Sequence, residues 1–120
     1  MGGGPVTALG PTYTMRESDL QTVVIQTAKL YGWRVSHFRA AKTDKGWRTP
    51  VEGDKGFPDL CLARDGVVII PELKSQRGRL SIDQELWGVA LGDLYRLWRP
   101  SDIPEIIEEL KRPSSRRPSR

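Results

Sequence analysis

The sequence predicts a mixed α/β fold in the order α-β-β-β-α-β-α, with helices on both faces of one mixed sheet. Three observations lead to this prediction. Apolar residues recur at helical spacing between Met15 and Tyr31, and a strand-like alternation follows at residues 33–38. An Asp-Gly turn between two apolar runs then indicates a β-hairpin, and helical and strand patterns alternate after it.

The first helix is expected over residues 15–31. Gly32 provides a stop signal at its end. Thr14 and Glu17 have the spacing of a capping box, in which the Glu17 side chain bonds back to the backbone of Thr14. The helical spacing is carried by Leu20, Val23, Val24, Thr27, Ala28 and Tyr31.

The elements on either side of the hairpin follow from simpler patterns. Residues 33–38, WRVSHF, alternate as a strand does, and residues 39–56 are polar, basic and rich in glycine, which predicts a long loop. After the hairpin, residues 81–91 are expected to form a helix that begins with a capping box of Ser81 and Gln84. The chain then continues with a strand at residues 94–98 and a closing helix at 103–110.

The Asp65-Gly66 turn fixes the register of the hairpin. With the turn centred between these residues, paired residues have numbers that sum to 131, so Asp59 lies opposite Glu72. Directly opposed side chains share a face, with Cβ atoms about 4.5–5.5 Å apart. The period of two places Lys74 on the same face. Apolar residues fill the other positions on both faces, which predicts burial of both.

Length and charge bound the organisation of the chain. The 120 residues allow one domain, expected at residues 14–110 between a flexible arm (1–13) and a disordered basic tail (111–120). The tail contains five of the 19 basic residues and no acid. Residues 34–48 hold five basic residues and one acid, whereas residues 102–109 hold four acids, so one side of the domain could face a polyanion.

The single cysteine and the absence of long apolar runs indicate a cytoplasmic protein. Cys61 has no partner for an intramolecular disulfide and is expected to be a small buried apolar residue. No apolar run approaches the roughly 20 residues of a membrane span, and the chain does not begin like a signal peptide.

Asp59, Glu72 and Lys74 are therefore expected to converge on one side of the sheet. Two opposed carboxylates repel each other and need a positive charge nearby. Carboxylate oxygens without a His or Cys cluster favour a hard cation, Mg²⁺ or Mn²⁺. Such an ion can polarise a phosphoryl oxygen and supply a hydroxide nucleophile, while Lys74 orients water or neutralises developing charge. The plainer alternative is an ordinary Glu-Lys surface pair.

Glu17, GFPD at residues 56–59, ELK at 72–74 and Gln84 together resemble the PD-(D/E)xK nuclease superfamily. The stretches GFPDL and ELKSQRGRLSIDQ are similar to its VRR-NUC branch, found in bacteria, phages and eukaryotic repair nucleases. The resemblance covers about residues 17–102 and implies a restriction-endonuclease-like fold with a Mg²⁺ or Mn²⁺ site. It implies metal ligation by Asp59, Glu72, the Leu73 carbonyl and Glu17, catalysis by Lys74, and a supporting role for Gln84.

Three of the candidate residues have structural alternatives. Glu17 could serve only as the capping-box partner of Thr14, and Gln84 only as that of Ser81. His37, the single histidine, could be a half-buried strand residue, with phosphate contact as its alternative function.

Basic residues near this site are candidate contacts to a nucleic-acid backbone. Ser75, Arg77 and Arg79 follow the metal edge and could reach the phosphates beside the cut. In the long loop, an aromatic residue could stack on a base among basic neighbours, although a solvated basic loop is the alternative. The loop candidates are Arg39, Lys42, Lys45, Trp47 and Arg48.

The sequence therefore predicts a metal-dependent DNA endonuclease. Stand-alone members of the VRR-NUC branch resemble Holliday-junction resolvases, which cut branched DNA as homodimers because symmetric cleavage needs two active sites. A monomeric nicking or flap nuclease would use the same site and is one alternative. A non-catalytic DNA-binding module is another, disfavoured because Asp59, Glu72 and Lys74 are all present.

Overall fold

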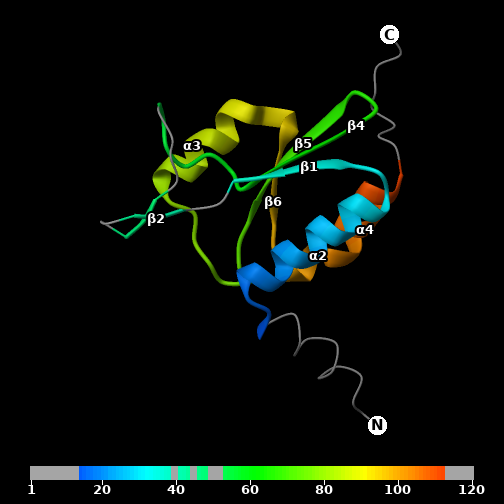
Figure 1. Ribbon diagram of the computed structural model, residues 1–120, viewed down its shortest axis with the longest axis horizontal. Helices are drawn as coiled ribbons and strands as arrows, with labels where there is room; N and C mark the ends of the chain where they lie inside the picture. Colours follow the sequence, from blue (N-terminus) through cyan, green and yellow to red (C-terminus); the bar gives the residue numbers. More distant parts are fainter. Residues whose placement is uncertain (1–13, 39–40, 44–45, 49–52, 113–120) are drawn as a thin grey trace.

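A four-stranded mixed sheet lies at the centre of the computed structural model, with helices on both of its faces (Figure 1). The structure describes residues 14–38, 41–43, 46–48 and 53–112, so the predicted arm and most of the basic tail lie outside it. β5 is antiparallel to β4 and parallel to β6. In sheet order the strands are β1 (Arg34–His37), β4 (Leu60–Arg64), β5 (Val67–Leu73) and β6 (Tyr95–Trp98).

Three α-helices of the described residues pack on this sheet: α2 (Glu17–Leu30), α3 (Ile82–Leu91) and α4 (Ile103–Lys111). α2 and α4 lie side by side on one face and α3 lies on the other (Figure 1). Two 3-10 turns, η1 (Gly92–Leu94) and η2 (Pro100–Asp102), flank β6. The mixed α/β class predicted from the sequence is therefore confirmed. None of the helices in the described ranges has the length and apolar character that a membrane crossing requires.

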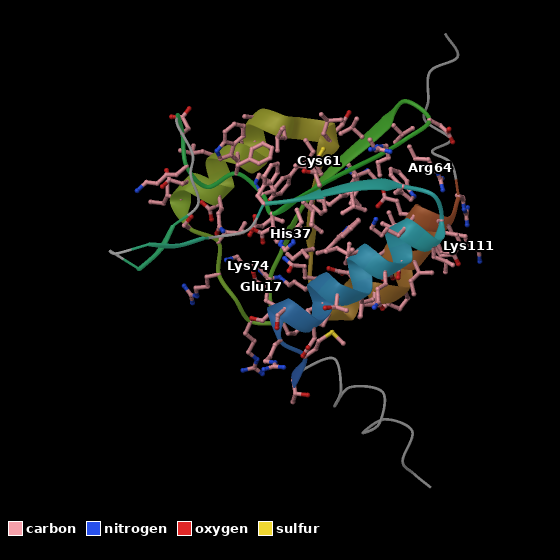
Figure 2. The ribbon with its side chains drawn as sticks, viewed as in Figure 1. Glu17, His37, Cys61, Arg64, Lys74 and Lys111 are labelled. Carbon is pink, nitrogen blue, oxygen red and sulfur yellow. The ribbon has the colours of Figure 1, made fainter. Side chains whose placement is uncertain are left out.

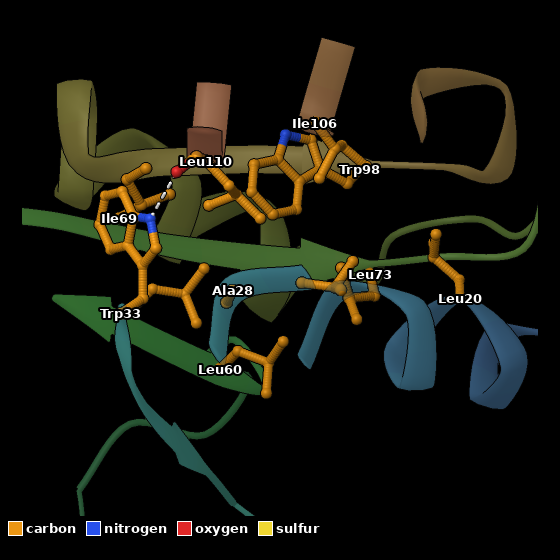
Figure 3. Close-up of a cluster of buried hydrophobic side chains, with 11 residues drawn as sticks. Leu20, Ala28, Trp33, Leu60, Ile69, Leu73, Trp98, Ile106 and Leu110 are labelled. Atoms are coloured by element: carbon orange, nitrogen blue, oxygen red, sulfur yellow. Dashed lines mark hydrogen bonds between the residues drawn. The ribbon is translucent and has the colours of Figure 1, made fainter. Parts of the chain in front are cut away.

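The hydrophobic core fills the space between the sheet and the α2–α4 pair (Figure 3). The buried positions of α2 repeat every four residues, so they form one stripe on the helix. Burial of each large apolar side chain contributes about 1.5–3 kcal/mol. The core residues are Leu20, Val24, Ala28, Trp33, Leu60, Leu62, Ile69, Leu73, Trp98, Ile106 and Leu110.

The opposite face of the sheet is less covered than the sequence suggested. No residue of α3 is buried, and its side chains Ile82, Leu86 and Val89 are 74%, 61% and 81% exposed. The main contacts of α3 are with β6 and η1. Cys61, on β4, therefore stays partly exposed and is not the fully buried residue expected.

The β4–β5 hairpin has the predicted register. Each pair in its ladder has numbers that sum to 131, as Leu62 with Ile69 does. Asp65 and Gly66 both have positive φ, 52° and 82°, as a type I′ turn requires. The same register, continued toward the start of β4, brings Asp59 toward Glu72.

Two short strands form where a loop was expected. β2 (Ala41–Thr43) and β3 (Gly46–Arg48) pair as a separate two-stranded sheet beside the main one (Figure 1). Neither run alternates apolar and polar residues, so the sequence pattern gave no strand signal. Thr43 faces Gly46 across a two-residue connection, the commonest length for a hairpin. The observed element order therefore has two more strands than the predicted order.

The predicted start of the first helix is wrong. α2 begins at Glu17, and Arg16, not Thr14, is its N-cap residue. The Asp19 carboxylate accepts a hydrogen bond from the Arg16 amide at 3.4 Å, so an acid at the third helical position takes the role expected of Glu17. Glu17 is thereby available for other contacts.

Arg64 joins the carboxyl ends of the two core helices. Its Nη1 donates to the Tyr31 carbonyl at 2.7 Å and to the Leu110 carbonyl at 3.1 Å, at the ends of α2 and α4. Its guanidinium lies 4.7 Å from the centre of the Trp33 ring. Trp33 also donates from Nε1 to the Leu110 carbonyl, at 2.8 Å. A positive charge at a helix carboxyl end is favourable, and this one serves two helices.

Replacement of Arg64 by Met is expected to lower the free energy of unfolding by about 2–3 kcal/mol, because charged hydrogen bonds to two helix ends are lost. The matched control is Arg34→Met, an exposed arginine on the neighbouring strand β1, which should change stability by less than about 0.5 kcal/mol. Urea unfolding measures both, and equal losses would contradict the assigned role of Arg64.

Candidate functional site

A buried carboxylate marks the carboxyl end of the central strand β5. Glu72 is 2% exposed and is the one buried charged side chain among the described residues. It lies on a strand paired on both sides, opposite Leu97 of β6. An ionised carboxylate in such a place is costly unless it is hydrogen-bonded and compensated by positive charge.

Glu17, Asp59, Glu72 and Lys74 form one electrostatically coupled group. The pKa of Glu72 is raised to about 8: burial is the largest cause, the negative charges of Asp59 and Glu17 add to the rise, and the positive charge of Lys74 opposes it. Burial also raises the pKa of Glu17, where Lys74 again opposes and Asp59 adds to the rise. These mutual influences support the predicted convergence of Asp59, Glu72 and Lys74.

His37 belongs to the edge of this group. Burial raises the pKa of Asp59, whereas the neighbouring His37 and Lys74 lower it. Figure 2 shows Glu17, His37 and Lys74 together near the first turn of α2. His37 is half-buried in β1, as the structural alternative proposed, yet it also lies near the candidate site. The position of His37 therefore agrees both with a structural role in β1 and with a phosphate contact at the candidate site.

Gln84 caps the helix α3 and also hydrogen-bonds to the buried Glu72. Its backbone amide donates to Ser81 Oγ at 3.1 Å, and its Oε1 accepts from the Ser81 amide at 2.8 Å, which completes the capping box of α3. Its Nε2 donates to Glu72 Oε2 at 3.0 Å. The cap fixes the side chain in the orientation that reaches the buried carboxylate.

The GFPD segment is held against α3, which places Asp59 at the entry to β4. Gly56 has a φ of +93°, and a Cβ there would lie 2.7 Å from Asp83 Cβ and 2.8 Å from its carbonyl carbon. Phe57 packs edge-to-face on Trp87 and on Phe38, with ring centres 4.8 and 5.6 Å away. Trp87 Nε1 donates to the Lys55 carbonyl at 3.1 Å.

Two aromatic residues have roles that the sequence interpretation missed. Trp87 is half-buried and binds the 54–57 segment. Tyr95 pairs with Ile70 in the parallel register, which places it on the same face of the sheet as Glu72. Its hydroxyl is buried without a hydrogen-bond partner among the described residues, and burial raises its pKa, with the charges of Glu72 and Glu85 adding to the rise. The strand–helix–strand order of β5, α3 and β6 was the sequence signal for this position of Tyr95, because a helical crossover usually joins parallel strands.

The predicted nucleic-acid contacts fall into two groups. Ser75, Arg77 and Arg79 follow directly after Lys74, and both arginines are exposed. The loop group surrounds the β2–β3 hairpin, which lies to one side of the main sheet (Figure 1). Lys42, Trp47 and Arg48 are on its strands, and Arg39 and Lys45 lie outside the described residues.

The carboxylates satisfy some requirements of a metal site. Across the described ranges, no three His, Cys, Asp or Glu side chains lie close enough together to hold one ion. Mg²⁺ needs fewer, because it keeps several waters and binds through one or two carboxylates together with substrate phosphates. Asp59 and Glu72 fit that requirement, and the Leu73 carbonyl is adjacent in the chain. Ligation by Glu17 stays a prediction.

The fold and the site together define a mixed α/β protein with a buried glutamate at the end of its central strand, electrostatically coupled to an aspartate and a lysine. Comparison of the chain with protein-family models, curated proteins and solved structures found no match. The resemblance to the VRR-NUC branch remains a prediction from the motifs.

Gly56→Ala is expected to lower the free energy of unfolding by more than about 1 kcal/mol, because an added Cβ combines an unfavourable φ with a collision against α3. Gly53→Ala is a matched control, since Gly53 has a φ of +97° but no atom within 4 Å of an added Cβ. Thermal unfolding of both variants isolates the collision from the backbone strain. Equal destabilisation would show that Gly56 does not pack against α3.

The stability of the metal-free protein is expected to fall as pH rises from about 4.5 to 8. Over this range the folded state keeps a proton on Glu72 that the unfolded chain releases, because its pKa rises from 4.5 to about 8 on folding. Glu72→Gln cannot ionise and still offers an oxygen to Gln84, so its stability should depend less steeply on pH. Urea titrations in EDTA measure the slopes, with exposed Glu105→Gln as the control. Parallel slopes in all three proteins would contradict the assignment.

Proposed function

We propose that the protein is a divalent-metal-dependent DNA endonuclease of the VRR-NUC type, with a restriction-endonuclease-like fold, acting in the cytoplasm. The observation that carries the proposal is the buried Glu72 carboxylate, coupled to Asp59 and to Lys74. An apolar residue at position 72 would avoid the cost of burying a carboxylate, so the presence of Glu72 there is better explained by function than by stability. Two carboxylates and a lysine in this arrangement are typical of metal-assisted phosphodiester hydrolysis.

Asp59 and Glu72 would hold Mg²⁺ or Mn²⁺, with the Leu73 carbonyl and Glu17 as further candidate ligands. When bound, the ion supplies charge that polarises the phosphoryl oxygen and lowers the pKa of water to give the nucleophile. Gln84 donates to Oε2 of Glu72, a bond that does not use Oε1. Ligands held by a second residue in this way keep a fixed orientation.

Lys74 is proposed as the catalytic cation. Its charge lowers the pKa of Glu17, of Asp59 and of Glu72, which supports a position near all three carboxylates. There it can orient the attacking water and stabilise negative charge that develops on the phosphoryl oxygens.

The substrate contacts are proposed on both sides of this centre. Ser75, Arg77 and Arg79 would bind phosphates next to the cut, and His37 one further phosphate. The β2–β3 hairpin would grip the backbone through Lys42 and Arg48, with Trp47 stacking on a base. Arg39 and Lys45 would extend that basic surface.

We further propose a homodimer that cuts branched DNA, as a Holliday-junction resolvase does. The supporting observation is the apolar stripe formed on α3 by Ile82, Leu86 and Val89, which are spaced at helical intervals and mostly exposed. An apolar stripe of this kind suits contact with the same stripe of a second copy across a two-fold axis. The dimer would provide the two active sites that symmetric cleavage needs.

Wild-type protein is expected to cut end-labelled DNA in Mg²⁺ or Mn²⁺ but not in EDTA, with four-way junctions preferred over duplexes and flaps. Lys74→Ala should lower the cleavage rate at least about 100-fold, because charge stabilisation in the transition state is lost. Lys29→Ala removes an exposed lysine at the far end of α2 and should cut normally.

The outcomes separate the alternatives. Cleavage by a protein whose mass stays monomeric at all concentrations in sedimentation would replace the resolvase with a nicking or flap nuclease. Tight DNA binding that survives EDTA, with no cleavage of any substrate, would indicate a non-catalytic DNA-binding module.

A further inference from the structure

The turn that follows Lys74 is held by a single arginine from a distant part of the chain. Arg99 Nη1 donates to the carbonyls of Ser75 at 2.8 Å, Gln76 at 3.2 Å and Gly78 at 2.8 Å. The turn closes on itself through a bond from the Gly78 amide to the Ser75 carbonyl, at 3.2 Å. Arg99 is partly buried, so these bonds are shielded from competing water.

Convergence of three carbonyls on Arg99 also sets the direction of the amides in this turn. In a planar trans peptide the N–H points opposite to the C=O. The amides of Gln76, Arg77 and Arg79 share peptide planes with the three bound carbonyls, so they point away from Arg99. Arg99 therefore sets the side of the turn that presents N–H groups, the backbone donors that bind phosphates.

The same turn contacts the side chain of Lys74. A Cβ added at Gly78 would lie 3.4 Å from Cδ of Lys74, so the Gly78 backbone packs against the lysine stem. The Lys74 amide donates to the Trp98 carbonyl at 3.0 Å, one residue before Arg99. Lys74 is thus fixed at its backbone by Trp98 and along its stem by a turn that Arg99 holds.

The residues after Arg99 complete this attachment. Gln76 Nε2 donates to Ser101 Oγ at 3.0 Å, and the Ser101 amide donates to Gln76 Oε1 at 3.0 Å. The Arg99 amide donates to Asp102 Oδ2 at 2.8 Å, which fixes the start of η2. Both side-chain bonds of Gln76 are exposed, so the partly buried guanidinium contributes the stronger attachment.

We propose that Arg99 is a positioning residue for Lys74 and for the phosphate contacts of residues 75–79, an inference that rests on the nuclease function proposed above. It acts through the backbone of the turn and touches neither the substrate nor the ion. Loss of its guanidinium leaves Lys74 chemically intact but less well placed, and a displacement of 1 Å in an active site costs on the order of 100-fold in rate.

The test compares Arg99→Gln with Arg96→Gln in the full-length protein. Arg96 lies three residues before Arg99, on β6, is also partly buried, and also donates to backbone carbonyls, but its ion pair at 2.7 Å is with Glu109 of α4. Each variant removes one positive charge and several hydrogen bonds. Arg99→Lys, which keeps the charge and three donors, serves as the conservative variant.

Two measurements are made on each variant: cleavage kinetics in Mg²⁺ and amide hydrogen exchange without DNA. Arg99→Gln is expected to lower kcat about 10- to 100-fold with little change in KM, because the lost interaction acts in the transition state. Its amides at residues 75–79 should exchange faster, and Arg99→Lys should recover part of both effects. Arg96→Gln should leave kcat and the exchange of this turn unchanged.

The result identifies which proposal fails. If the wild type cuts DNA and Arg99→Gln matches it in kcat, the positioning role is overturned and the nuclease function stands. If Arg96→Gln lowers kcat as much, loss of stability explains both variants and the positioning role is again overturned. If the wild type cuts no DNA, the proposed function fails, and the positioning role of Arg99 fails with it.

Discussion

Burial of the Glu72 carboxylate in the central strand is the constraint on which the site depends. A charge in this position is unfavourable without compensation, and the surrounding elements supply it in parts. Gln84 donates one hydrogen bond, Lys74 provides a positive charge, and the raised pKa keeps a proton on the acid near neutral pH. Gln84 belongs to α3 and Lys74 directly follows β5, so α3 and the end of β5 must be placed together.

The need to hydrogen-bond the buried Glu72 also explains why α3 is held against the sheet although none of its residues is buried. α3 is attached through polar and aromatic contacts, namely the Gln84 bond to Glu72 and the packing of Trp87 on Phe57. These contacts fix its first half against the site and leave Ile82 and Val89 exposed. An exposed apolar stripe on a helix that is already anchored costs little in the folded monomer and suits a partner surface.

The parts of the fold that the sequence could predict are those governed by local rules. The Asp65-Gly66 turn dictates the hairpin register, and extension of that register predicts the proximity of Asp59 and Glu72 that their electrostatic coupling supports. Local rules failed at the start of the first helix, where two spacings fit a capping box. The Thr14–Glu17 pair was expected to form it, but Arg16 and Asp19 do, and Glu17 is coupled to Lys74 and Asp59 instead. The bonds of Arg99 join residues more than twenty positions apart, so no sequence spacing reveals them.

The coupled acids also link the proposed metal chemistry to proton binding. In the metal-free protein burial raises the pKa of both Asp59 and Glu72, the charge of Asp59 adds to the rise for Glu72, and the charge of Lys74 does not bring either pKa back to its ordinary value. A divalent cation requires the ionised forms, so its binding must displace protons from this pair. Affinity for the ion would then increase with pH over the range in which Glu72 titrates. Gln84 limits the structural consequence of this change, because its N–H can donate to the carboxyl group in either protonation state, more strongly when that group is ionised.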